Sequence, residues 1–216
     1  MIGKYLKTNP KVSSLIAFGT AICGGSAIAA MAPVLKSSDE ETAVSLATIF
    51  TLNSVALFTF PLIGHYFNLT QSEFGLWAAL AIHDTSSVVG ASAAYGSSAL
   101  ALATTVKLTR AVWIAPIVLG MAWLKETDSK VKIPLFIIGF IAAAAFRSLL
   151  PGFIPFWDNV ALIAKQSLVV TLFLIGAGLS KNVLQDLGVR PLLQGILLWL
   201  LVSFATFILI VRGIIN

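Results

Sequence analysis

Charged residues are scarce in this chain. Asp, Glu, Lys and Arg make up 11% of its 216 residues, whereas a typical soluble domain carries about 25%. Hydrophobic residues reach 58%, and the mean hydropathy is +0.95. This composition excludes a soluble globular domain and predicts an integral membrane protein whose main partner is the lipid bilayer. The long apolar runs show no two-residue alternation, so we expect an all-α polytopic fold and not a barrel.

Cysteine and histidine are almost as scarce. Cys23 is the only cysteine, so neither an intramolecular disulfide nor a cysteine metal cluster can form. Two histidines and one cysteine are too few for a zinc site, and no HExxH, GxSxG or phosphate-loop motif is present. His83 and Asp84 are adjacent, so on a helix they point about 100° apart and make no ready acid–base pair. We therefore expect neither an enzyme nor a bound cofactor.

Seven segments are long and apolar enough to span a membrane, since a span needs roughly 20 such residues. They form one transmembrane domain over residues 1–216 and cover approximately 12–35, 42–64, 73–95, 98–124, 132–150, 160–180 and 191–212. With the N-terminus in the cytoplasm, eight Lys and Arg residues fall on the cytoplasmic side, and Lys36, Arg147 and Arg212 fall on the other. The positive-inside rule favours this orientation. The same rule explains the net charge of +5 without nucleic-acid binding.

The first segment contains a pattern that is typical of a broken helix. Its centre reads GTAICGGS, in which Cys23, Gly24, Gly25 and Ser26 follow one another. Glycine is about 1 kcal/mol worse than alanine in a helix interior, and transporters place unwound helix segments of this kind around a ligand near the bilayer midplane. The alternative is close helix packing through small residues.

The third segment carries the most polar run of the chain. His83, Asp84, Thr85, Ser86 and Ser87 stand in a row between apolar stretches. Because His or Asp at membrane depth costs a few kcal/mol, such residues normally face a protein-lined cavity. We interpret residues 75–96 as one wall of a buried polar site, and the helix there can itself open at the polar run.

The fourth segment contains two cations within an apolar run. Lys107 and Arg110 are three residues apart and share a helix face. One interpretation is that both extend to the outer membrane interface. The other is a cationic pair that faces the polar run of the third segment, because intramembrane charges usually lie inside the bundle and are paired.

Three ordered motifs, GTAICGGSAI, GLWAALAIHDTSSVVGASAAYG and VKLTRAVWIAPIVL, resemble the YeiH-type family of bacterial inner-membrane proteins, which is described as a sulfate exporter family. The resemblance implies a multi-pass inner-membrane transporter with one or two helices that are discontinuous at the midplane, similar to bile-acid/sodium symporters and sodium/proton antiporters. Family members are longer and have further helices ahead of the first motif. This chain is then either a truncated form or a departure from the family, and a second copy that supplies missing helices would make a homodimer.

Residue by residue, the family's Ser-Ile-Cys-Gly motif is matched by 21–24, where Ala21 replaces the serine. The family's histidine–acid pair falls on His83 and Asp84, and its Lys-x-x-Arg on Lys107 and Arg110. At 86–87, where relatives often have Ala-Gln, this chain has two serines, so an amide ligand is missing there.

These observations predict a secondary transporter of a small anion, with sulfate or an organic sulfonate as the substrate that the resemblance suggests. The cations attract the anion, hydroxyls donate to it, and His83 is the candidate for proton coupling; sodium is the other candidate coupling ion. The expected substrate- or ion-binding residues are Cys23, Gly24, Gly25, Ser26, His83, Asp84, Thr85, Ser86, Lys107 and Arg110.

Two other functions fit the same residues. In a cation/proton antiporter, Asp84 would bind the cation and Lys107 would compete for it. In a non-transporting scaffold, Asp84 and the two cations would form only a buried ion-pair network, and loss of one partner would cost about 3–5 kcal/mol. In the anion transporter, the role of Asp84 has three alternatives. It pairs with Lys107 or Arg110 when the anion is absent, or it carries a proton, or it binds a cation.

Overall fold

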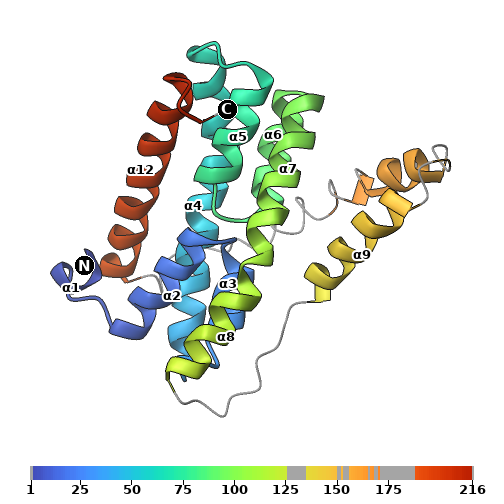
Figure 1. Cartoon of the computed structure of the whole chain (residues 1–216). Coiled ribbons are helices and arrows are strands. Elements are labelled where there is room, and N and C mark those ends of the chain that lie inside the picture. Colours follow the sequence, from blue (N-terminus) through green and yellow to red (C-terminus); the bar gives the residue numbers. More distant parts are fainter. Residues whose placement is uncertain are drawn as a thin grey trace.

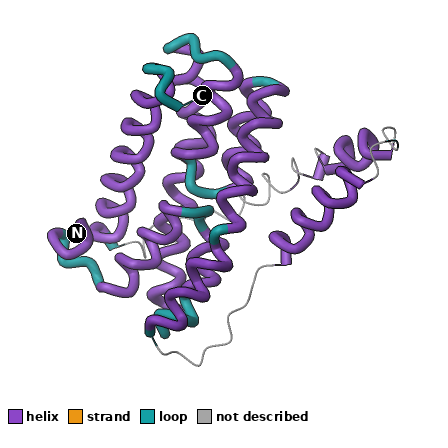
Figure 2. Tube along the Cα trace, in the orientation of Figure 1, coloured by secondary structure: helices purple, strands orange, loops and turns teal. Residues whose placement is uncertain are grey.

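The computed structural model describes residues 2–125, 135–149, 152, 156–164, 166–167, 170 and 188–215. All regular structure in these ranges is helical (Figures 1 and 2), which confirms the all-α membrane fold class. Most of the expected span 160–180, including Lys165, lies outside the described residues.

Among the described residues, three helical rods are long and apolar enough to cross a membrane. They are α4 (Asp39–Tyr66), α7 (Ser97–Val112) with α8 (Ile114–Leu124), and α12 (Val189–Val211). They correspond to the expected spans 42–64, 98–124 and 191–212. The short interruption between α7 and α8 is at Trp113, three residues before Pro116, whose ring clashes with the carbonyl one turn earlier.

Two pairs of short helices lie between these rods. The first hairpin is α2 (Pro10–Ala21) with α3 (Gly25–Met31), and the second hairpin is α5 (Gln71–Ala81) with α6 (Thr85–Tyr95). Each is interrupted where the sequence has its glycine or polar run, so the predicted discontinuity is confirmed in both segments. Figure 1 shows the first hairpin in the lower half of the molecule and the second in the upper half.

The first hairpin returns to the end of the molecule from which it starts. The Asn9 side chain, just before α2, donates to Glu41 Oε1 (2.9 Å), and Lys11 Nζ donates to the carbonyl of Lys36 (2.6 Å). Lys11 also pairs with Glu41 at 3.7 Å. The two ends of this hairpin, which we call its mouth, are therefore tied together.

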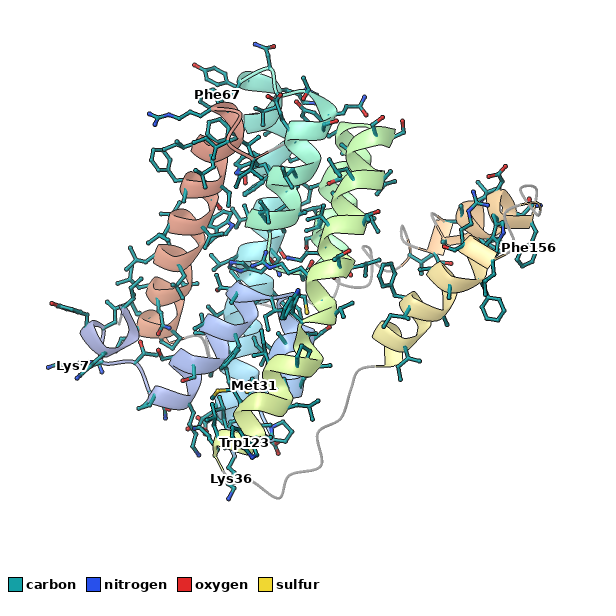
Figure 3. The ribbon with its side chains drawn as sticks, in the orientation of Figure 1. Lys7, Met31, Lys36, Phe67, Trp123 and Phe156 are labelled. Atoms are coloured by element: carbon teal, nitrogen blue, oxygen red, sulfur yellow. The ribbon has the colours of Figure 1, made fainter. Side chains whose placement is uncertain are left out.

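The second hairpin has its mouth at the opposite end. Gln71 Oε1, at the start of α5, accepts from the backbone N–H of Ser98 (2.9 Å), which follows α6. The Tyr95 hydroxyl donates to the carbonyl of Leu69, and its ring stacks on Phe74 of α5 at a centroid distance of 3.8 Å. Figure 3 labels Lys36 near the lower mouth and Phe67 near the upper one.

The structure thus differs from the expectation that 12–35 and 73–95 each cross the membrane. A helix of 12 or 11 residues is only about 16–18 Å long, roughly half of the 30 Å hydrocarbon core. At each break the chain reverses where the expectation had it continue. Each hairpin enters from one side and returns to it, and the two tips meet between the mouths.

This topology also moves Lys36 and residues 39–41. The expectation put them opposite the N-terminus, but they lie beside Asn9 and Lys11 at the first mouth. Figure 3 labels Lys7 and Lys36 at that end, and Lys11 bonds to Lys36. Lys125 ends α8 and Arg190 lies in the first turn of α12, at helix ends that Figure 1 shows on the same side, whereas Arg212 ends α12 on the other side. Short α1 (Ile2–Tyr5) also lies at the first end, packed near α2 and α12. Apolar α9 (Leu135–Leu149), within the expected span 132–150, contacts α7.

The apolar core is divided into two clusters. One surrounds the first hairpin with residues of α8, such as Ile114 and Val118. The other surrounds the second hairpin and includes Phe60 of α4 and Ala103 of α7. The hairpin tips lie where the clusters meet, so the polar residues of the tips form a seam between two hydrophobic regions.

Candidate functional site

The tips of the two hairpins touch. Gly24, at the first tip, has φ +67°, a conformation that side chains rarely adopt. A Cβ added to Gly24 would lie 3.1 Å from the Cβ of Asp84 at the second tip. Glycine therefore permits both the reversal of the chain and the close approach of the tips. Gly25 has the other expected role, packing, since its Cβ would lie 3.0 Å from Phe50 of α4.

Asp84 caps the second half of its own hairpin. Its Oδ1 accepts from the backbone N–H of Ser87 (2.6 Å), and its Oδ2 accepts from the Ser87 hydroxyl (3.2 Å) and from Asn53 Nδ2 (3.0 Å). A carboxylate at a helix N-terminus satisfies free N–H groups and meets the positive end of the helix dipole. The expected pairing of Asp84 with Lys107 or Arg110 is replaced here by these hydrogen bonds.

Both polar atoms of the Asn53 side chain, on α4, form hydrogen bonds with the second tip. Its Nδ2 donates to Asp84, and its Oδ1 accepts from the backbone N–H of His83 (3.1 Å). The predicted binding residues do not include Asn53, or Ser87 from the polar run. The feature of the sequence that could have indicated Asn53 is a polar amide within an apolar span, and Asn53 is buried in the structure. Asn53 thus supplies the amide that the family pattern had led us to expect from 86–87.

Lys107 is completely buried, with 0% of its surface exposed. Its Nζ donates to the carbonyls of Ile82 (2.7 Å) and Ala79 (3.4 Å) at the end of α5. This excludes the interpretation that Lys107 extends to the membrane interface. The ammonium instead satisfies carbonyls that the broken helix leaves without partners.

Arg110 connects the two hairpins. Its Nε and one terminal nitrogen donate to the carbonyl of Ala21, and that terminal nitrogen also donates to Thr20 (3.0 Å), both at the end of α2. Its other terminal nitrogen donates to the carbonyl of Leu80 in α5 (3.0 Å). One guanidinium therefore joins the carboxyl ends of α2 and α5, where a positive charge is favourable.

The ring of His83, at the second tip, makes no hydrogen bond. Neither ring nitrogen has a partner, and the residue is 1% exposed. Lys107 and Arg110 lie close enough to interact electrostatically with the ring. Because a buried polar group without a partner costs about 1–3 kcal/mol, the ring marks a place that is suited to a ligand with hydrogen-bonding groups.

The remaining predicted residues lie around this centre. Cys23 is buried and within electrostatic reach of both cations. Ser26 lies at the start of α3, and Thr85 and Ser86 lie in the first turn of α6; all three are half-buried. Thr20, which the prediction omitted, has a buried hydroxyl that makes no hydrogen bond. The structure thus brings all ten predicted residues to the two tips and to the face of α7 beside them.

The fold and the site define an α-helical integral membrane protein in which two opposed hairpins meet at a buried polar centre. A family described as "Conserved hypothetical protein 698" matches residues 1–195. The chain belongs to this family, whose members include proteins named UPF0324 membrane proteins. This confirms the resemblance drawn from the three motifs.

Several similar proteins carry that name. One from Geobacter sulfurreducens is 61% identical over 207 residues, which cover 96% of this chain and 67% of the relative. One from Bdellovibrio bacteriovorus is 49% identical over 99% of this chain and 68% of its own length, and one from Bacteroides thetaiotaomicron is 51% identical over 94% and 62%. The chain thus spans about two thirds of their length. No solved structure matches it.

Proposed function

We propose that this protein is part or all of a secondary transporter for a small anion, which binds where the two hairpin tips meet. The observation that carries the proposal is the buried His83 ring, which has two unpartnered nitrogens beside Lys107 and Arg110. An oxyanion would accept a hydrogen bond from the ring N–H and would supply a negative charge beside the two cations.

The opposed hairpins suggest how the anion reaches a site whose His83, Asp84 and Lys107 side chains are buried. The mouths of the two hairpins lie at opposite ends of the molecule. Withdrawal of the first hairpin would open the centre toward one end, and withdrawal of the second would open it toward the other. Alternation between these movements exposes one fixed site to either side, as transport requires.

The contacts of Asp84 favour an anion over a cation as the substrate. Both carboxylate oxygens already accept hydrogen bonds from Asn53 and Ser87. A cation at Asp84 would have to displace these donors and would also lie near two positive side chains. The cation/proton antiporter is therefore the weaker alternative. The expected homodimer and the coupling ion, proton or sodium, stay predictions.

Flux measurements in proteoliposomes test this function, with sulfate and methanesulfonate as substrates under imposed proton or sodium gradients. We expect His83→Ala to lower anion uptake by roughly tenfold or more, because a ligand contact in a buried site is lost. His65→Ala is the matched control, since His65 lies at the exposed end of α4 and stacks on Tyr95. Equal uptake by wild type and His83→Ala would refute the site, and no uptake of any small anion would refute the function.

A further inference from the structure

We infer that the site selects an oxyanion with a single negative charge, such as a sulfonate, over a dianion such as sulfate. This inference rests on the proposed function and deepens it. Its basis is the balance of charge at the hairpin tips, where Lys107 and Asp84 are buried and Arg110 is half-buried.

The side chains leave one positive charge. Lys107 and Arg110, both from α7, reach the tips, and Asp84 is the acid there. Among the described residues, the other side chains of the centre are uncharged: Asn53 of α4, the hydroxyls, and the buried thiol of Cys23. Two cations and one carboxylate therefore leave a surplus of one unit.

The helix ends do not change this balance. A helix carries roughly half a positive charge at its N-terminus and half a negative charge at its C-terminus. Each hairpin tip joins the C-terminus of one helix to the N-terminus of the next, so the contributions of each tip cancel. The surplus is thus set by the three charged side chains.

The imidazole of His83 is best read as neutral. The ring lies near Lys107 and Arg110, and neither of its nitrogens contacts a carboxylate, so a third positive charge there would be repelled. A neutral ring offers one donor and one acceptor. It adds hydrogen-bonding capacity to the site without adding charge.

A singly charged oxyanion offsets the surplus positive charge of the site. A dianion leaves one negative charge without a partner between two apolar clusters. Charges buried without compensation are strongly disfavoured. Sulfate and methanesulfonate share a tetrahedral sulfur centre and differ in charge, so they form a suitable pair for the test. Perchlorate, a singly charged ion with the shape of sulfate, separates the effect of charge from that of the methyl group.

The experiment compares initial uptake of labelled sulfate and methanesulfonate in proteoliposomes for wild type and Asp84→Asn. We expect wild type to favour methanesulfonate. Asp84→Asn removes one negative charge and keeps an oxygen that can accept from Ser87, so it should shift the uptake ratio toward sulfate by roughly tenfold or more. Ser54→Ala, a neutral change on α4 where Ser54 bonds only to its own helix, should leave the ratio unchanged.

The outcomes separate this inference from the proposed function. Uptake of sulfate in preference to methanesulfonate by wild type, or an unchanged ratio in Asp84→Asn, overturns the charge selection while the transport function stands. No uptake of either anion overturns both. Thermal unfolding gives a second readout, in which the Tm shifts with methanesulfonate and perchlorate are compared with the shift with sulfate in wild type and in Asp84→Asn. The general effect of each salt on stability is common to both proteins, so binding should appear as a relative preference for the singly charged anions that is larger in wild type. The same preference in both proteins contradicts the inference.

Discussion

The two hairpins share one architecture but are held in different ways. In the second hairpin, α6 begins at Asp84, whose carboxylate caps it, and Asn53 ties that tip to α4. In the first hairpin, α3 follows Gly24, which offers no side chain as a cap. The end of α2 at this tip is held by hydrogen bonds from Arg110 to the carbonyls of Thr20 and Ala21.

This difference indicates a division of roles. The second hairpin supplies His83 and Asp84, and several polar contacts hold its tip in place. The first supplies a close backbone surface whose main polar contact at the tip is one side chain of α7. A single guanidinium that binds both hairpins can respond to a ligand, because an anion that competes for its N–H groups loosens the first hairpin more than the second.

The largest expected effect concerns the reversal of the first hairpin. In a Cys23→Ala background, single cysteines at Lys11 and Lys36 should react with a membrane-impermeant thiol reagent from the same side. Cysteines at Gln71 and Ser98 should react only from the other side, because the two mouths lie at opposite ends.

If the first hairpin were a crossing helix, positions 11 and 36 would react from opposite sides. That result would show that the two hairpins do not share one architecture. By the positive-inside rule, we propose that the mouth with Lys11 and Lys36 faces the cytoplasm of the inner membrane. Reaction of those two cysteines in intact cells before permeabilisation would contradict that orientation.

Removal of Arg110 should have the largest effect on stability. Arg110→Ala leaves the carbonyls of Thr20, Ala21 and Leu80 without this donor, so we expect the free energy of unfolding in detergent to fall by about 3–5 kcal/mol. Arg212→Ala, at the exposed C-terminal end of α12, is the control. A loss below about 1 kcal/mol, the size of a typical surface change, would show that Arg110 does not join the hairpins.

Loss of Asn53 should affect the second hairpin alone. Asn53→Leu removes one donor to Asp84 and one acceptor for the His83 N–H, which we expect to cost about 2–3 kcal/mol. Hydrogen exchange, followed peptide by peptide, should rise around 82–87 and stay unchanged around 20–26. Equal increases at both tips would mean that the two hairpins are not held independently.

Gly24→Ala should have the smallest effect and act at the first tip. Alanine is strained at φ +67°, and its Cβ would lie 3.1 Å from that of Asp84, so we expect a loss of about 1–2 kcal/mol. Gly120→Ala in α8 is the matched control, since nothing lies within 4 Å of the added Cβ. That change should be neutral or stabilise by up to about 1 kcal/mol. Similar unfolding midpoints for the two variants would contradict a special role for Gly24.

Much of the local structure was predictable from short stretches of sequence. The run from Cys23 to Ser26 and the run from His83 to Ser87 predicted both breaks, because glycines and capping side chains act within one turn. The helix starts at Ser38 and Thr70 follow the same logic, since each forms a capping box with the Glu three residues later. That Lys107 and Arg110 face the polar run was one of the two interpretations that the sequence allowed.

The role of each of these residues was less predictable. Lys107 and Arg110 were expected to bind an anion or Asp84, but most of their donors are used on helix carbonyls. The role of Asn53 could not be predicted, because its two partners lie about 30 residues away in the chain. No local pattern records which carbonyls a break leaves near which side chain.

The sequence by itself determined that this is a helical membrane protein with two breaks and a buried set of charges, since hydropathy and helix-breaking residues act locally. Only the tertiary structure decided that the chain turns back at each break. That choice depends on contacts between distant residues, such as Lys11 with Lys36 and Gln71 with Ser98, which close the mouths. The same long-range contacts bring the two tips together and leave His83 between two cations with its ring nitrogens unpaired.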